Sequence, residues 1–378
     1  MDLNINQKVF LALLREGMWG IGNPDILIEG TIDWQEVYRL ATEQSVLGLV
    51  LSGLEHSDVK PPQVLLLQMI GEVQMIEQRN KAMNVFIADL VDKLRKADIY
   101  TVLVKGQGVA QCYERPYWRA CGDIDLLFTD SDYEESKVLL APLSSSNDIE
   151  DKKAKHIAYT VKNWIVELHG SLHSGLTSKI DKALDSIQKD TIVNQNIREW
   201  NNDGVIVSLP GVDNDIIFIF SHILQHFFRG GIGLRQICDW CRLLWAHKDS
   251  LNHGLLESRI RKMGLMTEWK AFAALAVEYL GMPEGAMPFY CKSKKYEKKA
   301  NSILLDVLKS GNFGHNNDLS YREKESFVVR KIIAIWRYSV DSIKHACIFP
   351  LDSLRIWWNL MRIGFRTTLR KQEYVNKV

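Results

Sequence analysis

Two aspartates, Asp123 and Asp125, stand one residue apart in the apolar run RACGDIDLLF (119–128). If this run is a strand, both carboxylates point to one face, while Ile124 and Leu126 point to the other. Two ionised carboxylates at close range repel each other, and a divalent cation between them relieves that repulsion. Hard oxygen ligands of this kind suit Mg²⁺ or Mn²⁺. A bare Asp-x-Asp also fits an exposed strand end or an Asx turn, so the pattern needs further support.

Three other features favour the metal interpretation. Glu167 lies inside an apolar strand-like run, where an acidic residue needs a partner and a shared metal supplies one. Lys105-Gly106 ends the preceding strand-like run, and a glycine there lets backbone amides approach an anion closely. Arg119 lies four residues before Asp123, and a guanidinium binds phosphate oxygens through two hydrogen bonds. Three carboxylates, a glycine turn and an arginine together indicate metal-assisted phosphoryl or nucleotidyl transfer.

The elements that must position these residues follow from hydrophobic periodicity. Helical spacing extends over 5–17, 34–56 and 61–99, with Asp33 as an N-cap and Glu36 completing a capping box. Short β-branched runs then alternate with helices. The predicted strands are 100–106, 124–130, 156–163 and 164–172, the helices between them 108–115 and 132–143, and the polar loop 144–155. Helical patterns return at 181–189, 213–228, 232–247, 253–280 and 296–310.

This order predicts an α+β fold, with a small mixed β-sheet core flanked by N- and C-terminal helical regions. The predicted division is a helical N-terminal region (1–97), the sheet core (98–178), a helical region lining the cleft (179–315) and a basic aromatic helical tail (316–378).

Composition excludes several classes of protein. The chain is 46% hydrophobic and 25% charged, which is typical of globular proteins. A net charge of +1 gives no overall field that would attract nucleic acid or an anionic membrane. The first residues show no signal-peptide pattern, and the six cysteines are scattered, so we expect a cytoplasmic protein with free thiols.

The stretch LVKGQGVAQCYERPYWRACGDIDLLF (103–128) resembles the signature of an uncharacterised bacterial nucleotidyltransferase family within the DNA-polymerase-β-like superfamily. That signature has the form LKG…Y..P..R..gDIDLL. Weaker similarity extends to the helical lead-in before it, to VELHGSL (166–172), to HILQHFFRGGIGLRQICDW (222–240) and to KSGNFG (309–314). The resemblance implies a metal-dependent enzyme that moves a nucleoside monophosphate from an NTP to an acceptor. The acceptor stays open among small molecules, saccharides, proteins and RNA.

Residue by residue, the resemblance implies these roles. Asp123, Asp125 and Glu167 would be the catalytic carboxylates and would bind Mg²⁺ or Mn²⁺. The nucleotide would be bound by Lys105, Gly106, Gln107 and Arg119. His169 shares the strand face of Glu167, so its position in the strand, apart from the resemblance, makes it a further candidate for binding phosphate. The turn reads Gly106-Gln107-Gly108, where the wider superfamily has Gly-Ser or Gly-Gly. For His169, a structural histidine is the alternative.

Two further pairs are candidates for lining the cleft. His222 and His226 lie four residues apart on one helical face, a spacing that also permits zinc, although no Glu follows the first histidine. Arg235 and Asp239 have the same spacing, which also fits an ordinary helical ion pair. The Cys-x-x-Cys at 238–241 has no second pair and lies in a helical stretch, which argues against zinc or redox chemistry.

The C-terminal segment 321–378 is basic and aromatic, with 12 Lys or Arg against five Asp or Glu. It is typical of a packed amphipathic helix with an exposed basic face, and it also fits weak contact with RNA or an anionic membrane surface. Pro350 is expected to separate it from the helix before. The alternatives to the main hypothesis are a toxin/antitoxin-type nucleotidyltransferase that modifies RNA or a partner protein, and a non-catalytic nucleotide-binding module.

Overall fold

The N-terminal region of the computed structural model is helical, as predicted. The structure describes residues 3–20, 30–312 and 327–375. The first helices are α1 (Ile5–Trp19), α2 (Trp34–Glu43), α3 (Leu47–Glu55) and α4 (Gln63–Lys96). Asp33 caps α2 as predicted, by accepting hydrogen bonds from the amides of Gln35 and Glu36. The Glu36 side chain binds Arg39 instead of closing the capping box.

The single helix predicted over 34–56 is broken between α2 and α3. Ser45 adopts a left-handed backbone conformation with φ of +56°, which no helix continues through. The buried Gln44 explains the break, because its side chain donates to the carbonyl oxygen of Val307 and accepts from the amide of Leu234. Contacts with distant helices therefore override the local helical pattern.

Glycines let α1 and α3 approach each other closely. A Cβ on Gly53 would overlap the carbonyl oxygen of Leu13, and a Cβ on Gly17 would overlap that of Leu49. Both obstacles are backbone atoms of a neighbouring helix, so they cannot move aside as a flexible side chain would.

We therefore expect Gly53→Ala to lower the free energy of unfolding by about 3 kcal/mol, because the two helices must separate. Gly71→Ala on α4 is the matched control, since a Cβ there meets open space. It should raise stability by about 0.5–1 kcal/mol, because alanine is the better helix former. Urea unfolding of both variants measures the difference, and equal stabilities would contradict this account of the α1–α3 contact.

The predicted small mixed sheet is confirmed. Its strands are β1 (Val102–Val104), β2 (Asp123–Leu127), β3 (Ser144–Asn147), β4 (His156–Val161) and β5 (Trp164–His169), in the order β1-β2-β5-β4-β3. β2 and β5 run parallel, and the other neighbouring pairs are antiparallel. The predicted turn at Lys162-Asn163 joins β4 to β5. α5 (Gly106–Ala110) follows β1, and α6 (Asp130–Leu140) follows β2.

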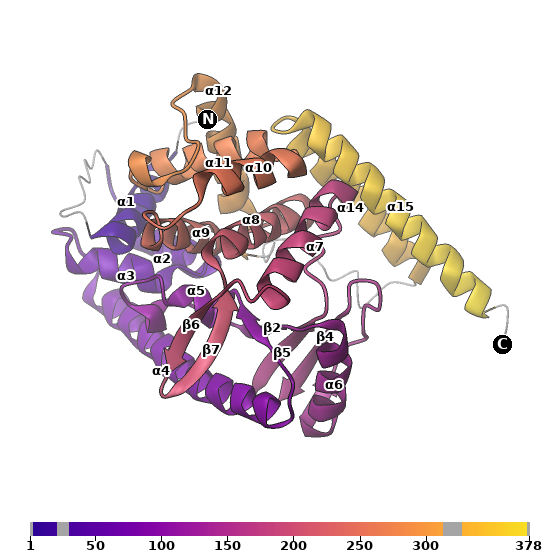
Figure 1. Ribbon diagram of the computed structural model, residues 1–378. Coiled ribbons are helices and arrows are strands. Elements are labelled where there is room, and N and C mark those ends of the chain that lie inside the picture. The colour runs from indigo at the N-terminus through magenta and orange to yellow at the C-terminus, as the bar shows by residue number, and fades with distance from the viewer. Residues whose placement is uncertain (1–2, 21–29, 313–326, 376–378) are drawn as a thin grey trace.

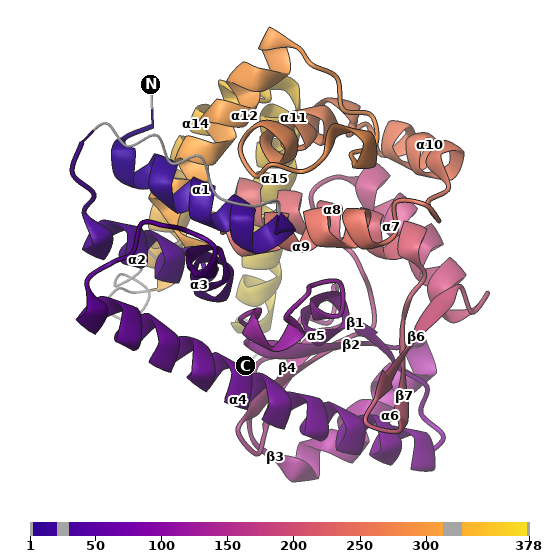
Figure 2. The same cartoon turned by 90° about the vertical axis from the view of Figure 1, so that its left-hand side faces the viewer.

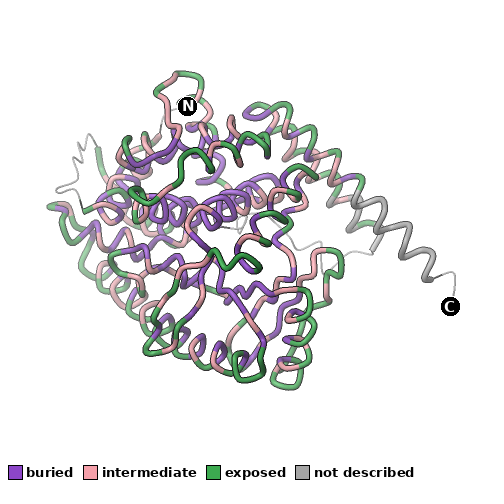
Figure 3. The backbone as a smooth tube through the Cα atoms, viewed as in Figure 1, coloured by how far each residue is buried: buried purple, intermediate pink, exposed green. Residues whose placement is uncertain are grey.

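The two faces of the sheet differ in chemistry. On one face, Ile124, Leu126, Val166 and Leu168 pack against α4 and α6 in an apolar core. The opposite face carries the acidic side chains and lies toward α8 (Val212–Arg229). Figure 2 shows α4 on one side of the sheet and α8 with α9 (Leu234–Ala246) on the other. In Figure 3, α8 and α9 are largely buried, so the acidic face is sheltered by a helical layer.

Two strand elements were not predicted. β3 lies in the stretch 144–155 that was expected to be a polar loop, and it forms the sheet edge beside β4. A separate hairpin consists of β6 (Ile197–Asn202) and β7 (Val205–Pro210), joined by Asp203-Gly204. Asp203 and Gly204 both have positive φ, as the turn of a two-residue hairpin requires. Asp-Gly between β-branched runs is itself a hairpin signal in the sequence.

The remaining helices build the second layer and the C-terminal hairpin. They are α7 (Ser178–Ile192), α10 (His253–Met263), α11 (Met266–Glu278), α12 (Lys294–Ser310), α14 (Phe327–Ala346) and α15 (Pro350–Val375). The helix predicted over 253–280 is two helices, because Gly264 with φ of +77° ends α10. Pro350 begins α15, which confirms the predicted break. Within the described ranges, no helix is long and apolar enough to cross a membrane.

The C-terminal hairpin extends from the body of the molecule (Figure 1, yellow). Asn359 of α15 donates to the carbonyl oxygens of Gly175 and Leu176, which attaches the hairpin to the segment after β5. Trp336 and Trp358 are about two-thirds exposed. Contact of 321–378 with RNA or a membrane stays a prediction, as does the division into four regions. Residues 321–326 and 376–378, and the Phe-Gly of KSGNFG, lie outside the described residues.

A buried acid that lies against this hairpin should make the stability of the protein depend on pH. Burial, and then the neighbouring Asp352 of α15, raise the pKa of the fully buried Glu268 to about 9. The folded protein thus keeps a proton that the unfolded chain releases near pH 4.3. The folded state binds more protons between these values, so the free energy of unfolding should fall as the pH rises from about 5 to 9.

We expect Glu268→Gln to flatten this decline, since the amide has no proton to lose. Denaturant unfolding of both proteins at several pH values measures it. A slope that persists unchanged in the variant would assign the pH dependence to other groups.

Candidate active site

The register of β2 and β5 brings the three predicted carboxylates to one face of the sheet. Asp125 lies directly opposite Glu167 in the parallel pair. Asp123 precedes Asp125 by two residues and therefore shares its face. Sequence alternation accounts for the pairing of the two aspartates, whereas their meeting with Glu167 depends on β2 and β5 being neighbours.

Asp125 is the buried centre of the group. Its Oδ1 lies 2.7 Å from Nζ of Lys105 and 2.8 Å from Nε2 of His169, and its side chain is 3% exposed. The side chains of Lys105 and His169 are 16% and 14% exposed, and that of Glu167 is 25% exposed. Solvent therefore reaches the site from the Glu167 side.

His156 is a member of the site that the sequence argument missed. Its Nε2 donates to Oε2 of Glu167 at 3.1 Å, and Nε2 of His169 lies 3.5 Å from the same oxygen. A signal was present in the sequence. The turn predicted at residues 162–163 fixes the β4–β5 register, and counting back along both strands places His156 opposite His169.

The charges of the site are strongly coupled. Repulsion by Asp125, followed by burial, raises the pKa of Asp123. Burial acts to raise the pKa of Glu167, but hydrogen bonds from His156 and His169 hold it well below the usual range. Burial acts to lower the pKa of Lys105, and the attraction of Asp125, Glu167 and Asp123 outweighs it and raises that pKa. Lys105 is thus a cation, and Glu167 an anion, at neutral pH.

The turn after β1 is strained. Lys105 has φ of +58° and ψ of −151°, a conformation that costs a non-glycine residue about 1–3 kcal/mol. Gly106 follows with φ of +47°, which glycine adopts freely. The first helical bonds of α5 are those of Gly108 and Val109 to the carbonyl oxygen of Lys105. The strain is concentrated where the sequence predicted phosphate binding.

A scan against protein-family models matches residues 30–281 to a family described as an uncharacterised nucleotidyltransferase. This match covers two thirds of the chain. The chain belongs to that nucleotidyltransferase family. The resemblance drawn from the DIDLL motif is thereby confirmed at the level of the family.

None of the curated proteins matches. Among solved structures, an antigenic nucleotidyltransferase-like protein from Paracoccidioides brasiliensis is similar over 53% of this chain and 92% of that chain, at 14% identity and a TM-score of 0.32.

Two residues expected to bind nucleotide have their side chains in other contacts in this nucleotidyltransferase. Gln107 is buried, and its amide donates to Oδ1 of Asn80 on α4. Arg119 is buried in a two-point ion pair with Asp239, with Nε–Oδ1 and Nη2–Oδ2 distances of 3.0 and 2.6 Å. Asp239 thus pairs with Arg119, whereas Nη1 of Arg235 donates to the carbonyl oxygen of Ala120. This geometry gives Arg119 a structural contact between the start of β2 and α9.

The predicted histidines on α8, His222 and His226, are close enough to Lys105 for its charge to lower their pKa values. The rings of His222 and His226 are 4.4 Å apart, and Nζ of Lys105 lies 6.0 Å from the ring of Phe218, one turn earlier. Burial, and then the charge of Lys105, lower the pKa of His222 well below its usual value and that of His226 to about 4. Both rings are neutral at pH 7, which keeps a second positive charge away from Lys105.

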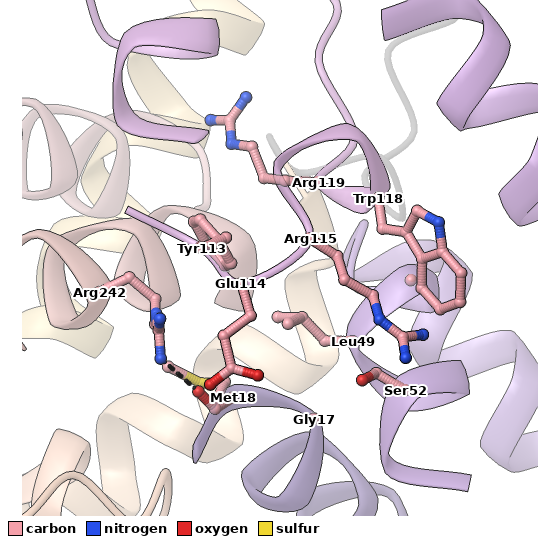
Figure 4. A pocket seen from close by; sticks show the side chains of 11 residues that line it. Gly17, Met18, Leu49, Ser52, Tyr113, Glu114, Arg115, Trp118, Arg119 and Arg242 are labelled. Carbon is pink, nitrogen blue, oxygen red and sulfur yellow. Dashed lines mark hydrogen bonds between the residues drawn. The ribbon is translucent and has the colours of Figure 1, made fainter. Parts of the chain in front are cut away.

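A small hollow lies away from the carboxylates, between α1, α3 and the segment before β2 (Figure 4). Its volume of about 20 Å³ has room for one water molecule, not for a nucleotide. Its arginines are held by the protein: Arg242 donates to the carbonyl oxygens of Met18 and Cys112, and Arg115 binds Glu55. The hollow is therefore a packing feature.

Proposed function

We propose that this nucleotidyltransferase moves a nucleoside monophosphate from an NTP to an acceptor, releases pyrophosphate, and requires Mg²⁺ or Mn²⁺. The observation that carries the proposal is the alignment of Asp125 with Glu167, with Asp123 on the same face. Repulsion by Asp125 raises the pKa of Asp123, and a cation bound between the two carboxylates would relieve that repulsion. When bound by them, the ion would neutralise the triphosphate and the charge developing at the α-phosphate.

Phosphate binding is assigned to the strained turn. The ammonium group of Lys105 lies 2.7 Å from Oδ1 of Asp125 and ends a flexible side chain, so it can turn from Asp125 to a phosphate oxygen. The amides of Gly106 and Gln107 precede the first helical bonds of α5 and are suited to contact phosphate oxygens. In this proposal Gln107 acts through its backbone, because its side chain binds Asn80.

The acceptor is assigned to the Glu167 side, where the site is open. In the transfer step, an acceptor hydroxyl oxygen bonds to the α-phosphorus. The bond from that phosphorus to the bridging oxygen breaks, pyrophosphate keeps the electron pair, and the hydroxyl proton passes to solvent. Glu167 orients the hydroxyl, because its lowered pKa makes it a weak base. His169 holds Asp125 and Glu167 in place.

The test is incubation of the protein with each α-labelled NTP, Mg²⁺ or Mn²⁺, and a fractionated cell extract. Transfer of label to a small molecule, saccharide, protein or RNA supports the proposal and identifies the acceptor class. Self-labelling is checked without extract. Stabilisation of the protein by NTP and metal, without transfer in any fraction, would overturn the proposal in favour of a non-catalytic nucleotide-binding module.

A further inference from the structure

We propose that His156, Glu167 and His169 bind a divalent transition-metal ion of the kind that accepts imidazole ligands, such as Zn²⁺ or Mn²⁺. The inference rests on the proposed function, because Glu167 belongs to the same carboxylate group. It adds two imidazole ligands to a site in which the sequence predicted oxygen ligands alone, and so it changes which metal the site prefers.

Two of the distances within the triad are those of ligands around one ion. Oε2 of Glu167 lies 3.1 Å from Nε2 of His156 and 3.5 Å from Nε2 of His169. All three ligand atoms lie within 4.8 Å of one another. Nitrogen and oxygen ligands placed 2.0–2.2 Å from an ion are separated from each other by about 3–3.5 Å. Among the described residues, this is the one group of three or more such side chains that converges in this way.

The sheet itself sets this convergence. His169 follows Glu167 by two residues on β5 and therefore shares its face. The antiparallel register places His156 directly opposite His169, and Ala158 opposite Glu167. The small side chain of Ala158 leaves the Glu167 carboxylate room to lean toward both imidazoles. The three ligands thus stand on a rigid pair of strands, and strands hold metal ligands more precisely than loops do.

The chemistry of the ligands selects the metal. Imidazole nitrogen is a good ligand for first-row transition metals, whereas Mg²⁺ is bound by oxygen and keeps much of its water. Oδ1 of Asp125 lies 2.8 Å from Nε2 of His169 and is the nearest candidate for a further ligand, although Lys105 shares that oxygen. The triad is sufficient without it.

Access to the triad is open on the outer side. The side chain of His156 is 36% exposed, whereas that of Asp125 is 3% exposed. An ion, or a phosphate oxygen bound to it, can therefore reach the triad without displacing the buried Asp125.

The experiment titrates the chelator-treated, full-length protein with Zn²⁺, Mn²⁺ and Mg²⁺ by calorimetry, and with Co²⁺ by visible absorption, in the absence of NTP. We expect Zn²⁺ to bind at least about a hundredfold more tightly than Mg²⁺. His156→Ala should weaken Zn²⁺ binding at least about a hundredfold, because loss of an outer partner alone costs 10- to 100-fold. His173→Ala is the matched control, since His173 pairs with the exposed Asp185 outside the triad. It should bind Zn²⁺ as the wild type does.

Zinc binding by His156→Ala equal to that of the wild type, or equal affinities for Zn²⁺ and Mg²⁺, would overturn the proposal. His156→Gln is a second variant with a polar side chain, and circular dichroism verifies that both variants are folded. The result is independent of the transfer assay. Selective Zn²⁺ binding without nucleotidyl transfer would support the metal triad and reject the proposed function. Mg²⁺-supported transfer without selective Zn²⁺ binding would support the proposed function and reject the metal triad.

Discussion

Asp125→Asn is expected to lower kcat/KM for nucleotidyl transfer by a factor of about 10³ or more, because the buried centre of the carboxylate group loses its charge. The substitution keeps the shape of a side chain that is 3% exposed. It removes the negative partner of Lys105 and leaves His169 facing a neutral amide. The affinity for the metal ion and the position of Lys105 should both change, so the loss of kcat/KM should exceed that from removing one hydrogen bond.

Incorporation of label from α-labelled NTP into the acceptor measures this effect, and thermal unfolding tests whether the fold persists. Asp130→Asn is the matched control, because Asp130 is an exposed aspartate that pairs with Lys155 at the start of α6. It should retain the wild-type rate. A metal-dependent rate in Asp125→Asn equal to that of the wild type would remove Asp125 from the catalytic group.

The sequence supports prediction of the site only where its residues are local. Strand alternation is sufficient to place Asp123 and Asp125 together, and the tight turn after β4 contains the information that locates His156. The parallel pairing of β2 with β5 is different, since α6, β3 and β4 lie between the two strands in the chain. Glu167 enters the predicted site as an acidic residue inside an apolar strand, and the family resemblance adds its role as the third carboxylate. Neither argument shows that β5 lies beside β2.

Helix boundaries and distant ion pairs show the same limit. The break at Ser45 depends on Gln44 reaching Val307, more than 260 residues away. Arg119 pairs with Asp239 across 120 residues, whereas helical spacing alone favoured Arg235 as the partner. Local patterns predict which face of an element is polar. They do not predict which of several distant polar groups will lie against it.

Arg119→Met is expected to lower the free energy of unfolding by about 3–5 kcal/mol, because it leaves the Asp239 carboxylate buried without its cation. Arg119 and Asp239 are both largely buried and make two hydrogen bonds. A further hydrogen bond to Asp239, from the hydroxyl group of Tyr113 at 2.8 Å, does not neutralise the charge. Urea unfolding followed by circular dichroism measures the loss.

The double variant Arg119→Met, Asp239→Leu separates a structural ion pair from a nucleotide contact. If the pair is structural, removing both charges should recover most of the lost stability, since no buried charge is left alone. The Michaelis constant for NTP in the double variant should then stay near the wild-type value. Arg119 precedes β2, so the pair fixes the chain that carries Asp123 against α9. A Michaelis constant raised tenfold or more, with stability recovered, would instead return Arg119 to the nucleotide site.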